Sequence, residues 1–247
     1  MANSNKKVAL ITGANKGLGL EMAKQLGEQG MTVVLAGRSI DAVNAAAKGL
    51  REKGIDAHAL ELDVTRDDHV ARVADEIASR FARLDVLVNN AGAMLDGIWM
   101  GNSATSGSKK VLIDTFDINF FAVVSVTRAL VPLLKKSPAG RIVNMSSIMG
   151  SLTIHSDPTS PLAGTKPFAY DASKAALNAF TVHLAADLAG TPIKVNSAHP
   201  GWVKTDLGTE AAPMNVDEGA KTGVFLATLP DDGPTGGFYH AGERLPW

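Results

Sequence analysis

The chain has 247 residues, of which 45% are hydrophobic and 20% are charged, and this length allows one large domain with a sizeable core. The formal net charge is −1 and the Lys and Arg residues are scattered, which argues against a nucleic-acid-binding patch and an acidic disordered tail. Because the sequence has no cysteine, it excludes disulfides, thiolate zinc sites and a cysteine nucleophile.

The apolar stretches are too short or too interrupted to predict a membrane segment. Residues 1–7 are polar, and the apolar run at 8–11 is too short for the core of a signal peptide. The most apolar later stretch, 118–134, is interrupted by an asparagine, an arginine and a proline. We therefore expect a soluble, cytoplasmic protein that binds neither membranes nor nucleic acid.

The first predicted strand leads directly into a glycine-rich turn. Residues 8–12 are apolar, the turn is Gly13-Ala14-Asn15-Lys16-Gly17-Leu18-Gly19, and residues 20–28 show helical periodicity. Glycine permits the positive φ angles and the close backbone approach that a pyrophosphate needs. This order of elements predicts a dinucleotide site, although such turns also join strands to helices without any ligand.

The second predicted strand, 31–36, ends in Gly37-Arg38-Ser39. In a dinucleotide-binding fold this position meets the adenosine ribose, where an acid holds a free 2′-hydroxyl and Arg suits a 2′-phosphate. Here the acid is missing, Arg38 is present, and Lys16 in the glycine turn adds a second cation. We therefore expect NADP(H) in preference to NAD(H); the alternative is that Arg38 is only a solvated loop residue.

Strands and helices then alternate at regular intervals. Helices are predicted over 41–52 and 67–81, and strands over 57–62, which ends before Asp63-Val64, and over 84–88. Such alternation predicts parallel pairing with right-handed crossovers and a sheet covered on both faces. The expected fold class is α/β, a single doubly wound Rossmann domain with a central parallel sheet of about seven strands flanked by helices.

Polar residues follow two of the predicted strands. Strand 84–88 runs into Asn89-Asn90-Ala91-Gly92, and a strand over 141–145 ends in Ser146-Ser147. In open parallel sheets ligands bind outside the carboxyl ends of the strands, so these residues should gather at one edge with Thr12.

Between these strands, a polar, Gly- and Ser-rich excursion over 93–110 precedes a long predicted helix, about 116–135. Asn119 stands among apolar residues in that helix. Asparagine is a poor choice inside a helix unless its side chain has a task, and an exposed or back-bonded Asn119 is the alternative.

A second connection, 148–169, is rich in Pro, Ser and Thr and leads to Tyr170-Asp171-Ala172-Ser173-Lys174. Residues 175–188 are rich in Ala and Leu and indicate a helix, on which Tyr170 and Lys174 would share one face. A phenol has a pKa of roughly 10, and a nearby ammonium lowers it. The two residues form a plausible acid–base pair, although solvated helices also carry Tyr and Lys at this spacing.

The remaining elements complete one domain. A strand over 193–198 precedes Pro200-Gly201, an excursion over 203–215, a helix over 216–228 and a short strand over 236–240. No linker or repeat divides the chain, so residues 1–247 are expected to form a single domain. No His and acid pair has the spacing of metal ligands, and we expect no metal site.

These motifs, taken together and in this order, resemble those of the short-chain dehydrogenase/reductase family over essentially the whole chain. The matching positions are Thr12-Gly13-x-x-x-Gly17-x-Gly19, Asn89-Asn90-Ala91-Gly92, Asn119, Ser147, Tyr170-x-x-x-Lys174 and Pro200-Gly201. The chain is most similar to the carbonyl-reductase group, whose features it shares at 14–19, 36–38 and 119–121 and in the long connection between Ser147 and Tyr170.

The resemblance implies an NADPH-dependent oxidoreductase that reduces an aldehyde, ketone or quinone to an alcohol. Tyr170 would give a proton to the developing alkoxide while hydride reaches the carbonyl carbon. Lys174 would lower the pKa of Tyr170 and hold the nicotinamide ribose. Ser147, with Ser146 as the alternative, would hydrogen-bond the carbonyl oxygen, and Asn119 would hold a water that passes protons to Lys174.

The resemblance also implies which residues bind the cofactor: Gly13, Asn15, Lys16, Gly17, Leu18, Gly19, Arg38, Asp63, Val64, Asn90, Ala91, Gly92, Tyr170, Lys174, Pro200, Gly201, Val203 and Thr205. The excursions over 93–110, 148–169 and 203–215 would lie on the substrate side. Two other functions stay open, an NAD(P)-dependent dehydrogenase of a specific alcohol, sugar or steroid and a non-catalytic nucleotide-sensing module. The oligomeric state, monomer or homo-oligomer, is also open.

Overall fold

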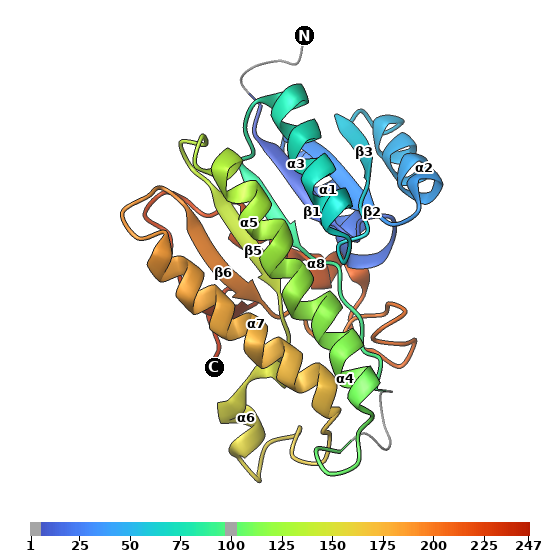
Figure 1. Cartoon of the computed structure of the whole chain (residues 1–247), viewed down its shortest axis with the longest axis vertical. Helices are drawn as coiled ribbons and strands as arrows, with labels where there is room; N and C mark the ends of the chain where they lie inside the picture. The colour runs from blue at the N-terminus through green and yellow to red at the C-terminus, as the bar shows by residue number, and fades with distance from the viewer. Residues whose placement is uncertain (1–5, 97–102) are drawn as a thin grey trace.

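The computed structural model describes residues 6–96 and 103–247. In this part of the chain the strands form one eight-stranded sheet in the order β3-β2-β1-β4-β5-β6-β7-β8 (Figure 1). The strands are β1 (Val8–Thr12), β2 (Thr32–Gly37), β3 (Ala57–Glu61), β4 (Val86–Asn89), β5 (Arg141–Met145), β6 (Lys194–Ala198), β7 (Gly237–His240) and β8 (Glu243–Arg244). The expected doubly wound parallel sheet is confirmed.

The short strand β8 is an antiparallel addition at the sheet edge that the sequence did not predict. It pairs with β7 through a tight hairpin whose turn residues, Ala241 and Gly242, have φ angles of 49° and 86°. Two consecutive positive φ angles are typical of the turn type that matches the twist of a hairpin.

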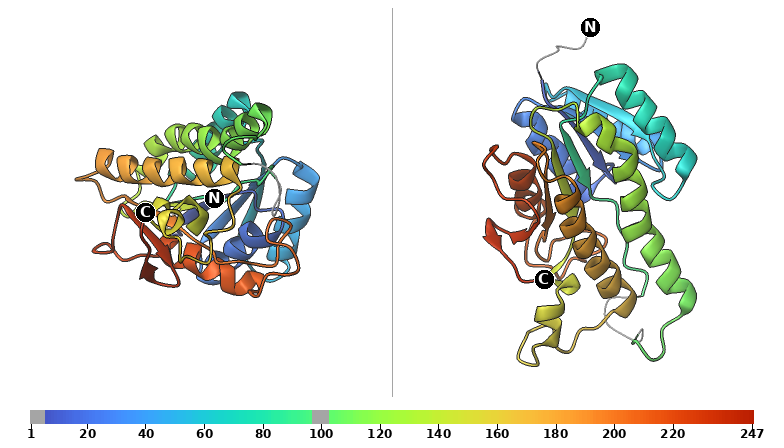
Figure 2. Two further views of the ribbon diagram at one scale, coloured as in Figure 1. Left: turned by 90° about the horizontal axis from the view of Figure 1, so that it is seen from below. Right: turned by 60° about the vertical axis from the view of Figure 1, so that its left-hand side comes forward.

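Helices cover both faces of the sheet (Figures 1 and 2). One face packs against α1 (Gly17–Glu28), α2 (Ile40–Arg51) and α8 (Val216–Ala227), and the other against α3 (Asp67–Phe81), α5 (Ala122–Leu134) and α7 (Phe168–Asp187). Since both faces are covered, every residue of β1 and β2 is buried, which explains their continuous apolar sequences.

The long helix before β5 begins earlier than expected. α4 (Lys109–Phe116), a π-helical turn (Asp117–Phe121) and α5 follow one another directly, whereas the sequence indicated a start at about residue 116. The predicted excursion over 93–110 therefore ends in the first residues of a helix, and residues 97–102 within it lie outside the described part. A π-turn inside a helix often marks a functional position, and this one contains Asn119.

The second connection, predicted only as a loop, contains a 3₁₀ turn (Ile148–Gly150) and the short helix α6 (Leu152–Ser156). In Figure 1 it extends from the lower end of the molecule, beyond the carboxyl ends of the strands. The end of the chain helps to hold it there, because the backbone N–H of Thr153 donates to the carbonyl oxygen of Trp247 at 2.9 Å.

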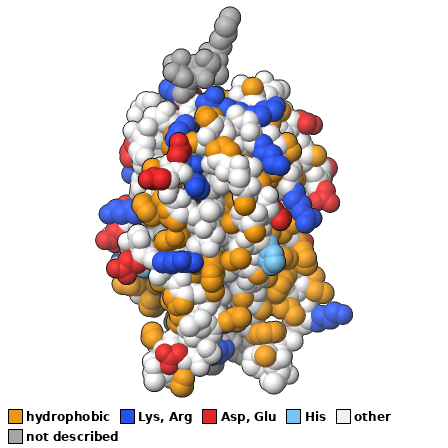
Figure 3. Space-filling model, turned by 90° about the vertical axis from the view of Figure 1, so that its left-hand side faces the viewer, with side chains coloured by type: hydrophobic (Ala, Val, Ile, Leu, Met, Phe, Trp, Pro, Cys, Tyr) orange, Lys and Arg blue, Asp and Glu red, His pale blue; other side chains and the backbone are white. Residues whose placement is uncertain are grey.

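The run Lys109–Leu134 is long and apolar enough to cross a membrane, and its most apolar 18 residues have a mean hydropathy of 1.5. Its side chains also belong to the core, where Val126, Leu130 and Leu134 pack with residues of α3 and α7. Figure 3 shows that apolar side chains gather on the lower part of one face of the molecule. Core helices of soluble proteins pass the same test of length and composition, so the run is weak evidence for a membrane span, and the expectation of no membrane contact stays a prediction.

Candidate active site

The glycine turn after β1 depends on backbone conformations that suit glycine. Gly13 and Gly17 have φ angles of 64° and 57°. A Cβ atom on Gly19 would lie 2.5 Å from the carbonyl oxygen of Gly13, whereas one on Gly17 would meet nothing closer than Thr205 Cγ2 at 3.7 Å. The turn is thus tight on its inner side at Gly19 and open at Gly17, as the approach of a pyrophosphate requires.

Thr12 and Asn90 fasten this turn to the end of β4. The Thr12 hydroxyl oxygen accepts hydrogen bonds from the backbone N–H groups of Asn90 and Ala91, both at 3.0 Å. The Asn90 side-chain amide donates to the carbonyl oxygens of Thr12 at 2.9 Å and Gly13 at 3.2 Å. The Asn90 side chain is therefore committed to holding the turn in shape.

The start of α1 suits an anion. Its N-cap residue, Lys16, makes no capping hydrogen bond with its side chain, and the first turn contains no acidic residue. The Lys16 ammonium instead forms an ion pair with Asp206, in the segment after β6. The uncapped helix start and the open glycine turn fit the pyrophosphate of a dinucleotide.

The predicted adenosine-binding residues follow β2 and β3. Arg38 is exposed, and its charge acts on the carboxyl of Asp63. Burial would raise the pKa of Asp63, but hydrogen bonds from Thr65 and the charge of Arg38 outweigh it and hold that pKa below its usual value. Asn15 lies beside Gly37 at the end of β2. The Lys16 ammonium is paired with Asp206.

Ser147, Tyr170 and Lys174 come together at the carboxyl end of β5, and all three are buried. The Ser147 hydroxyl lies close enough to the Tyr170 phenol to act on its pKa, which it lowers. The Lys174 ammonium donates to the carbonyl oxygen of Met145 at 2.9 Å and lies 5.6 Å from the centre of the Tyr170 ring. The acid–base pair expected from the sequence therefore shares one site with Ser147.

The geometry distinguishes the two neighbouring serines. Ser146 donates from its hydroxyl to the side-chain oxygen of Asn178 at 2.7 Å and so ties β5 to α7. Ser147 faces the other way, toward the Tyr170 phenol, and accepts from the backbone N–H of Met149 at 3.2 Å. This arrangement favours Ser147 as the residue that meets a substrate oxygen.

Burial is the main cause of the shifted pKa values of Tyr170 and Lys174. It raises the pKa of Tyr170 to about 12, and the charges of Asp171 and Asp96 act in the same direction, while the contact with Ser147 opposes them. It lowers the pKa of Lys174 to about 8. The Tyr170 pKa thus shifts in the direction opposite to the one expected from Lys174, because burial disfavours the charged phenolate.

Asn119 is fully buried and joins two parts of the site. Its side-chain oxygen accepts from the backbone N–H of Ala93 at 2.9 Å, and its amide donates to the Ala93 carbonyl at 2.8 Å and to the Ser173 hydroxyl at 3.0 Å. A Cβ atom on Gly92 would lie 3.2 Å from Asn119 Oδ1 and 3.5 Å from Lys174 Nζ. The task that the sequence indicated for Asn119 includes fixing the backbone after β4.

The segment after β6 closes the site on the remaining side. Gly201 has a φ of 89°, and Val203 forms an isolated bridge with Met214. The Thr205 hydroxyl donates to the Val203 carbonyl at 3.3 Å and accepts from the N–H of Gly208 at 3.1 Å. Because the Thr205 methyl faces Gly17, the segment after β6 lies next to the glycine turn.

The sequence profile of the short chain dehydrogenase family matches residues 7–215. The chain belongs to this family. As a short-chain dehydrogenase it is an oxidoreductase, and the expected family and fold are confirmed.

Relatives of this short-chain dehydrogenase match it along nearly its whole length. Short-chain dehydrogenase/reductase 1 of Saponaria officinalis is 34% identical, over 99% of this chain and 97% of the relative. Salutaridine reductase of Papaver bracteatum is 33% identical, over 96% and 95%. The structure of NADPH-bound carbonyl reductase from chicken fatty liver superposes with a TM-score of 0.84 at 26% identity, covering 98% of this chain and 99% of the other.

A ladder of buried polar side chains, not foreseen from the sequence, fastens two helices of this short-chain dehydrogenase to its sheet. The Asn89 side-chain amide donates to the Thr127 hydroxyl at 2.9 Å and to the side-chain oxygen of Asn144 at 2.8 Å. Asn144 donates to the Thr181 hydroxyl at 2.9 Å, which also bonds to Ser197 at 2.9 Å. Polar residues at matching positions of three adjacent strands, Asn89, Asn144 and Ser197, were the available signal.

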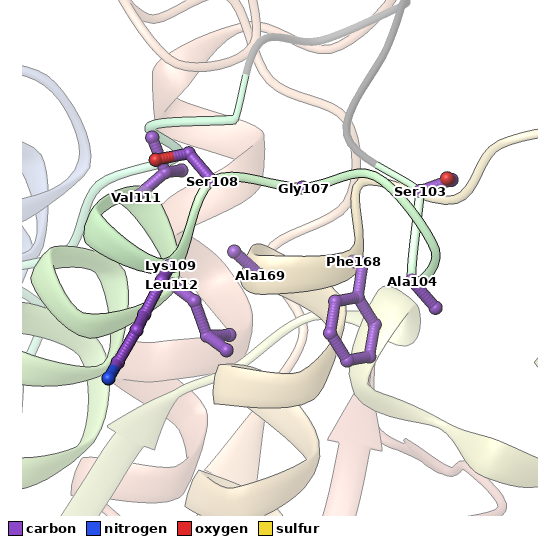
Figure 4. A pocket seen from close by; sticks show the side chains of 9 residues that line it. All are labelled: Ser103, Ala104, Gly107, Ser108, Lys109, Val111, Leu112, Phe168 and Ala169. Carbon is purple, nitrogen blue, oxygen red and sulfur yellow. The ribbon is translucent and has the colours of Figure 1, made fainter.

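Figure 4 shows a cavity where the start of α4 meets the start of α7. It has a volume of about 190 Å³ and is formed by the segment before α4, the start of α4, and Phe168 and Ala169 at the start of α7. None of its lining residues is Ser147 or Tyr170. Since it is smaller than most sites for small-molecule ligands, it is not assigned as the site of reaction.

Two histidines lie at the ends of β6 and β7. The rings of His199 and His240 are 4.9 Å apart, and burial together with the charge of His240 lowers the pKa of His199 to about 3. Across residues 6–96 and 103–247, no three His, Asp or Glu side chains are grouped so that they could hold a metal ion.

Proposed function

We propose that this short-chain dehydrogenase reduces the carbonyl group of a small aldehyde, ketone or quinone to an alcohol, with NADPH as the hydride donor. The observation that carries the proposal is the contact of the buried Tyr170 phenol with Ser147, beside the Lys174 ammonium. A hydroxyl, a proton donor and a cation held in water-poor surroundings are the groups that stabilise a developing alkoxide.

Each residue has a distinct task in this proposal. Bound NADP(H) supplies the hydride chemistry. The Ser147 hydroxyl orients the carbonyl oxygen next to the phenol, and Tyr170 donates its proton to that oxygen. The high pKa of Tyr170 keeps the phenol protonated before reduction, and Lys174 stabilises the phenolate that remains. Asn119 holds Ala93 and the start of the neighbouring segment in place.

The preference for NADP(H) over NAD(H) is part of the proposal. It is supported by Arg38 at the end of β2, where no acid is present to hold a ribose hydroxyl. The carbonyl reductase from chicken fatty liver, which this chain resembles in fold, binds NADPH. Lys16 adds a second cation once its ion pair with Asp206 opens.

A cytoplasmic location is also proposed, supported by the absence of cysteine, which suits a reducing compartment. Cell fractionation tests it, and recovery of the protein with membranes would contradict it.

The test of the proposed function follows NADPH oxidation against a panel of quinones, aromatic aldehydes, diketones and simple ketones, with NADH in parallel. We expect turnover with NADPH and little with NADH. Replacing Tyr170→Phe should lower kcat by about a hundredfold or more, because general acid catalysis contributes about 10²–10⁴-fold, while NADPH binding persists.

The variant Arg38→Asp is the matched test of cofactor choice, because it replaces the phosphate-binding cation with the acid that suits NAD(H). It should lower kcat/KM for NADPH and raise it for NADH. An unchanged preference would overturn the role of Arg38. Full activity of Tyr170→Phe would overturn the role of Tyr170 as proton donor. Tight NADPH binding by the parent with no turnover of any carbonyl or alcohol would overturn the catalytic proposal and favour a nucleotide-sensing module.

A further inference from the structure

The four residues that follow the turn after β4 are fastened at both ends. At the first end, Ala93 exchanges two backbone hydrogen bonds with the Asn119 side chain, at 2.9 and 2.8 Å. At the other end, the Asp96 carboxylate accepts from the backbone N–H groups of Ala169 at 2.8 Å and Tyr170 at 3.3 Å. Asp96 is only 2% exposed, so both hydrogen bonds are shielded from water.

These contacts supply a cap that α7 lacks in its own sequence. The N-cap residue of α7 is Pro167, which makes no side-chain hydrogen bond to the first turn. A carboxylate at a helix start satisfies unpaired N–H groups and interacts favourably with the helix dipole. Because Asp96 comes from a segment 74 residues away in the sequence, it fixes the first turn of α7 against the end of β4.

We propose that Asp96 is a positioning residue for the reaction: by capping the first turn of α7 through the backbone of Ala169 and Tyr170, it sets the place and orientation of the Tyr170 phenol. This inference rests on the proposed function of Tyr170 as proton donor. Asp96 does not meet the phenol in this role; it acts through the backbone to which the phenol is attached.

The charge of Asp96 has a second consequence at the phenol. The groups near Tyr170 that can carry charge are the Asp96 and Asp171 carboxyls and the Lys174 ammonium. Negative charge on either carboxyl raises the pKa of Tyr170, because it disfavours a further negative charge on the phenolate. Removing the charge of Asp96 while keeping its hydrogen bonds should therefore lower the pKa of the phenol.

Other groups around Asp171 belong to the connection before α7. His155 Nε2 lies 3.3 Å from the Asp171 carboxylate and 2.9 Å from the Met149 carbonyl oxygen. The Lys166 ammonium lies 2.7 Å from His155 Nδ1 and donates to the His155 carbonyl at 2.9 Å. These groups stay unchanged in variants of Asp96, so they do not obscure the effect of its charge.

The experiment separates the cap from the charge by two substitutions. Asp96→Asn removes the charge but keeps an oxygen that can accept from the two N–H groups, and Asp96→Ala removes both. Asp68→Ala is the matched control, because Asp68 is an exposed acid in the first turn of α3 that pairs with Arg66. Carbonyl reduction with NADPH, NADPH affinity and the pH dependence of kcat are measured for each folded variant.

Asp96→Ala should lower kcat by about ten- to a hundredfold, since small displacements of a catalytic group cost about that much, while NADPH affinity stays unchanged. Asp96→Asn should keep most of the turnover, and its loss of activity at alkaline pH should begin at a lower pH than in the parent. Asp68→Ala should behave as the parent in every measurement.

Two results would overturn the inference. One is an Asp96→Ala variant with the kcat and the pH profile of the parent. The other is a folded Asp96→Asn variant that is as impaired as Asp96→Ala and loses activity at the same alkaline pH as the parent, since neither the cap nor the charge of Asp96 would then explain the loss. If Asp96→Ala does not fold, the pH profile of Asp96→Asn decides. A parent enzyme without carbonyl reduction would instead refute the proposed function, which keeps the two failures distinct.

Discussion

The two halves of the carboxyl edge of the sheet are built by different means. Around β1 and β4, the phosphate turn is shaped by glycine backbone angles and by uncharged hydrogen bonds among Thr12, Asn90 and Gly13. Around β5 and β6, the site is lined by buried titratable groups, and burial shifts the pKa values of Tyr170, Lys174 and His199.

This difference predicts how each half should respond to substitutions and to pH. The cofactor half depends on shape, so added atoms should damage it at any pH. The catalytic half depends on the protonation states of groups that the fold removes from water, so pH and single charges should affect it most. Two kinds of substitution can test this contrast. One adds atoms to the cofactor half without changing its charge, and the other removes a titratable group from the catalytic half.

The largest effect is expected for Gly19→Ala in the cofactor half. The new methyl group would lie 2.5 Å from the Gly13 carbonyl oxygen and 2.6 Å from the Asn90 amide nitrogen. Overpacking of this kind costs about 1–3 kcal/mol, and the displaced turn should also weaken NADPH binding. Urea unfolding and fluorescence titration with NADPH measure the two effects, which should be similar at pH 6 and pH 8.

Gly49→Ala in α2 is the matched control, because a Cβ atom there meets nothing within 4 Å. It should raise the free energy of unfolding by about 0.5–1 kcal/mol, since glycine is the poorer helix former, and leave NADPH affinity unchanged. Equal effects of the two substitutions would contradict the view that the glycine turn is shaped by close backbone contact.

The sequence predicted most of the fold because its signals are local. Apolar strands and amphipathic helices alternate clearly, and the glycine turn lies between a strand and a helix, as expected. The start of α4 at Lys109 was missed because the polar residues before it obscure the helix boundary. The π-turn at Asn119 was not predictable, since it accompanies a contact with Ala93, 26 residues away in the sequence.

The sequence predicted which residues form the candidate site better than it predicted their pKa values and ion pairs. Spacing and family resemblance indicated Ser147, Tyr170 and Lys174, and the structure brings them together. The raised pKa of Tyr170 could not be derived from sequence, because it depends on burial and on Asp96, which lies far away in the chain. The ion pair of Lys16 with Asp206 likewise joins segments that only the fold brings together.

A second prediction concerns His199 in the catalytic half. Its pKa is about 3 in the folded chain and 6.5 in an unperturbed histidine, so the unfolded chain binds more protons between these values. The free energy of unfolding should therefore fall as the pH falls from 6.5, by up to about 1.4 kcal/mol per pH unit from this group. His199→Asn should remove this part of the slope in urea unfolding measured at pH 7, 6 and 5. A parallel slope in the variant would show that His199 is not responsible.

The smallest effect, and the one with the opposite sign, is expected for Asp171→Asn. Burial and the charge of Asp96 raise the pKa of Asp171 to about 8, whereas Lys166 lowers it. The stability linked to this group is therefore fully present below its ordinary pKa of 3.8 and is lost as the pH rises through about 8.

The Asp171 carboxyl keeps some contact with solvent, so the penalty should stay within about 1 kcal/mol, or about 2–4 °C in Tm for a chain of this size. Asp171→Asn should raise Tm at pH 8.5 and change it little at pH 5, where most of the parent's carboxyl is protonated in the folded chain. Thermal unfolding at the two pH values measures the difference. An equal change in Tm at both pH values would mean that packing around Asp171, and not its charge, sets the stability of this half. The contrast between the two halves would then be confined to Tyr170, Lys174 and His199.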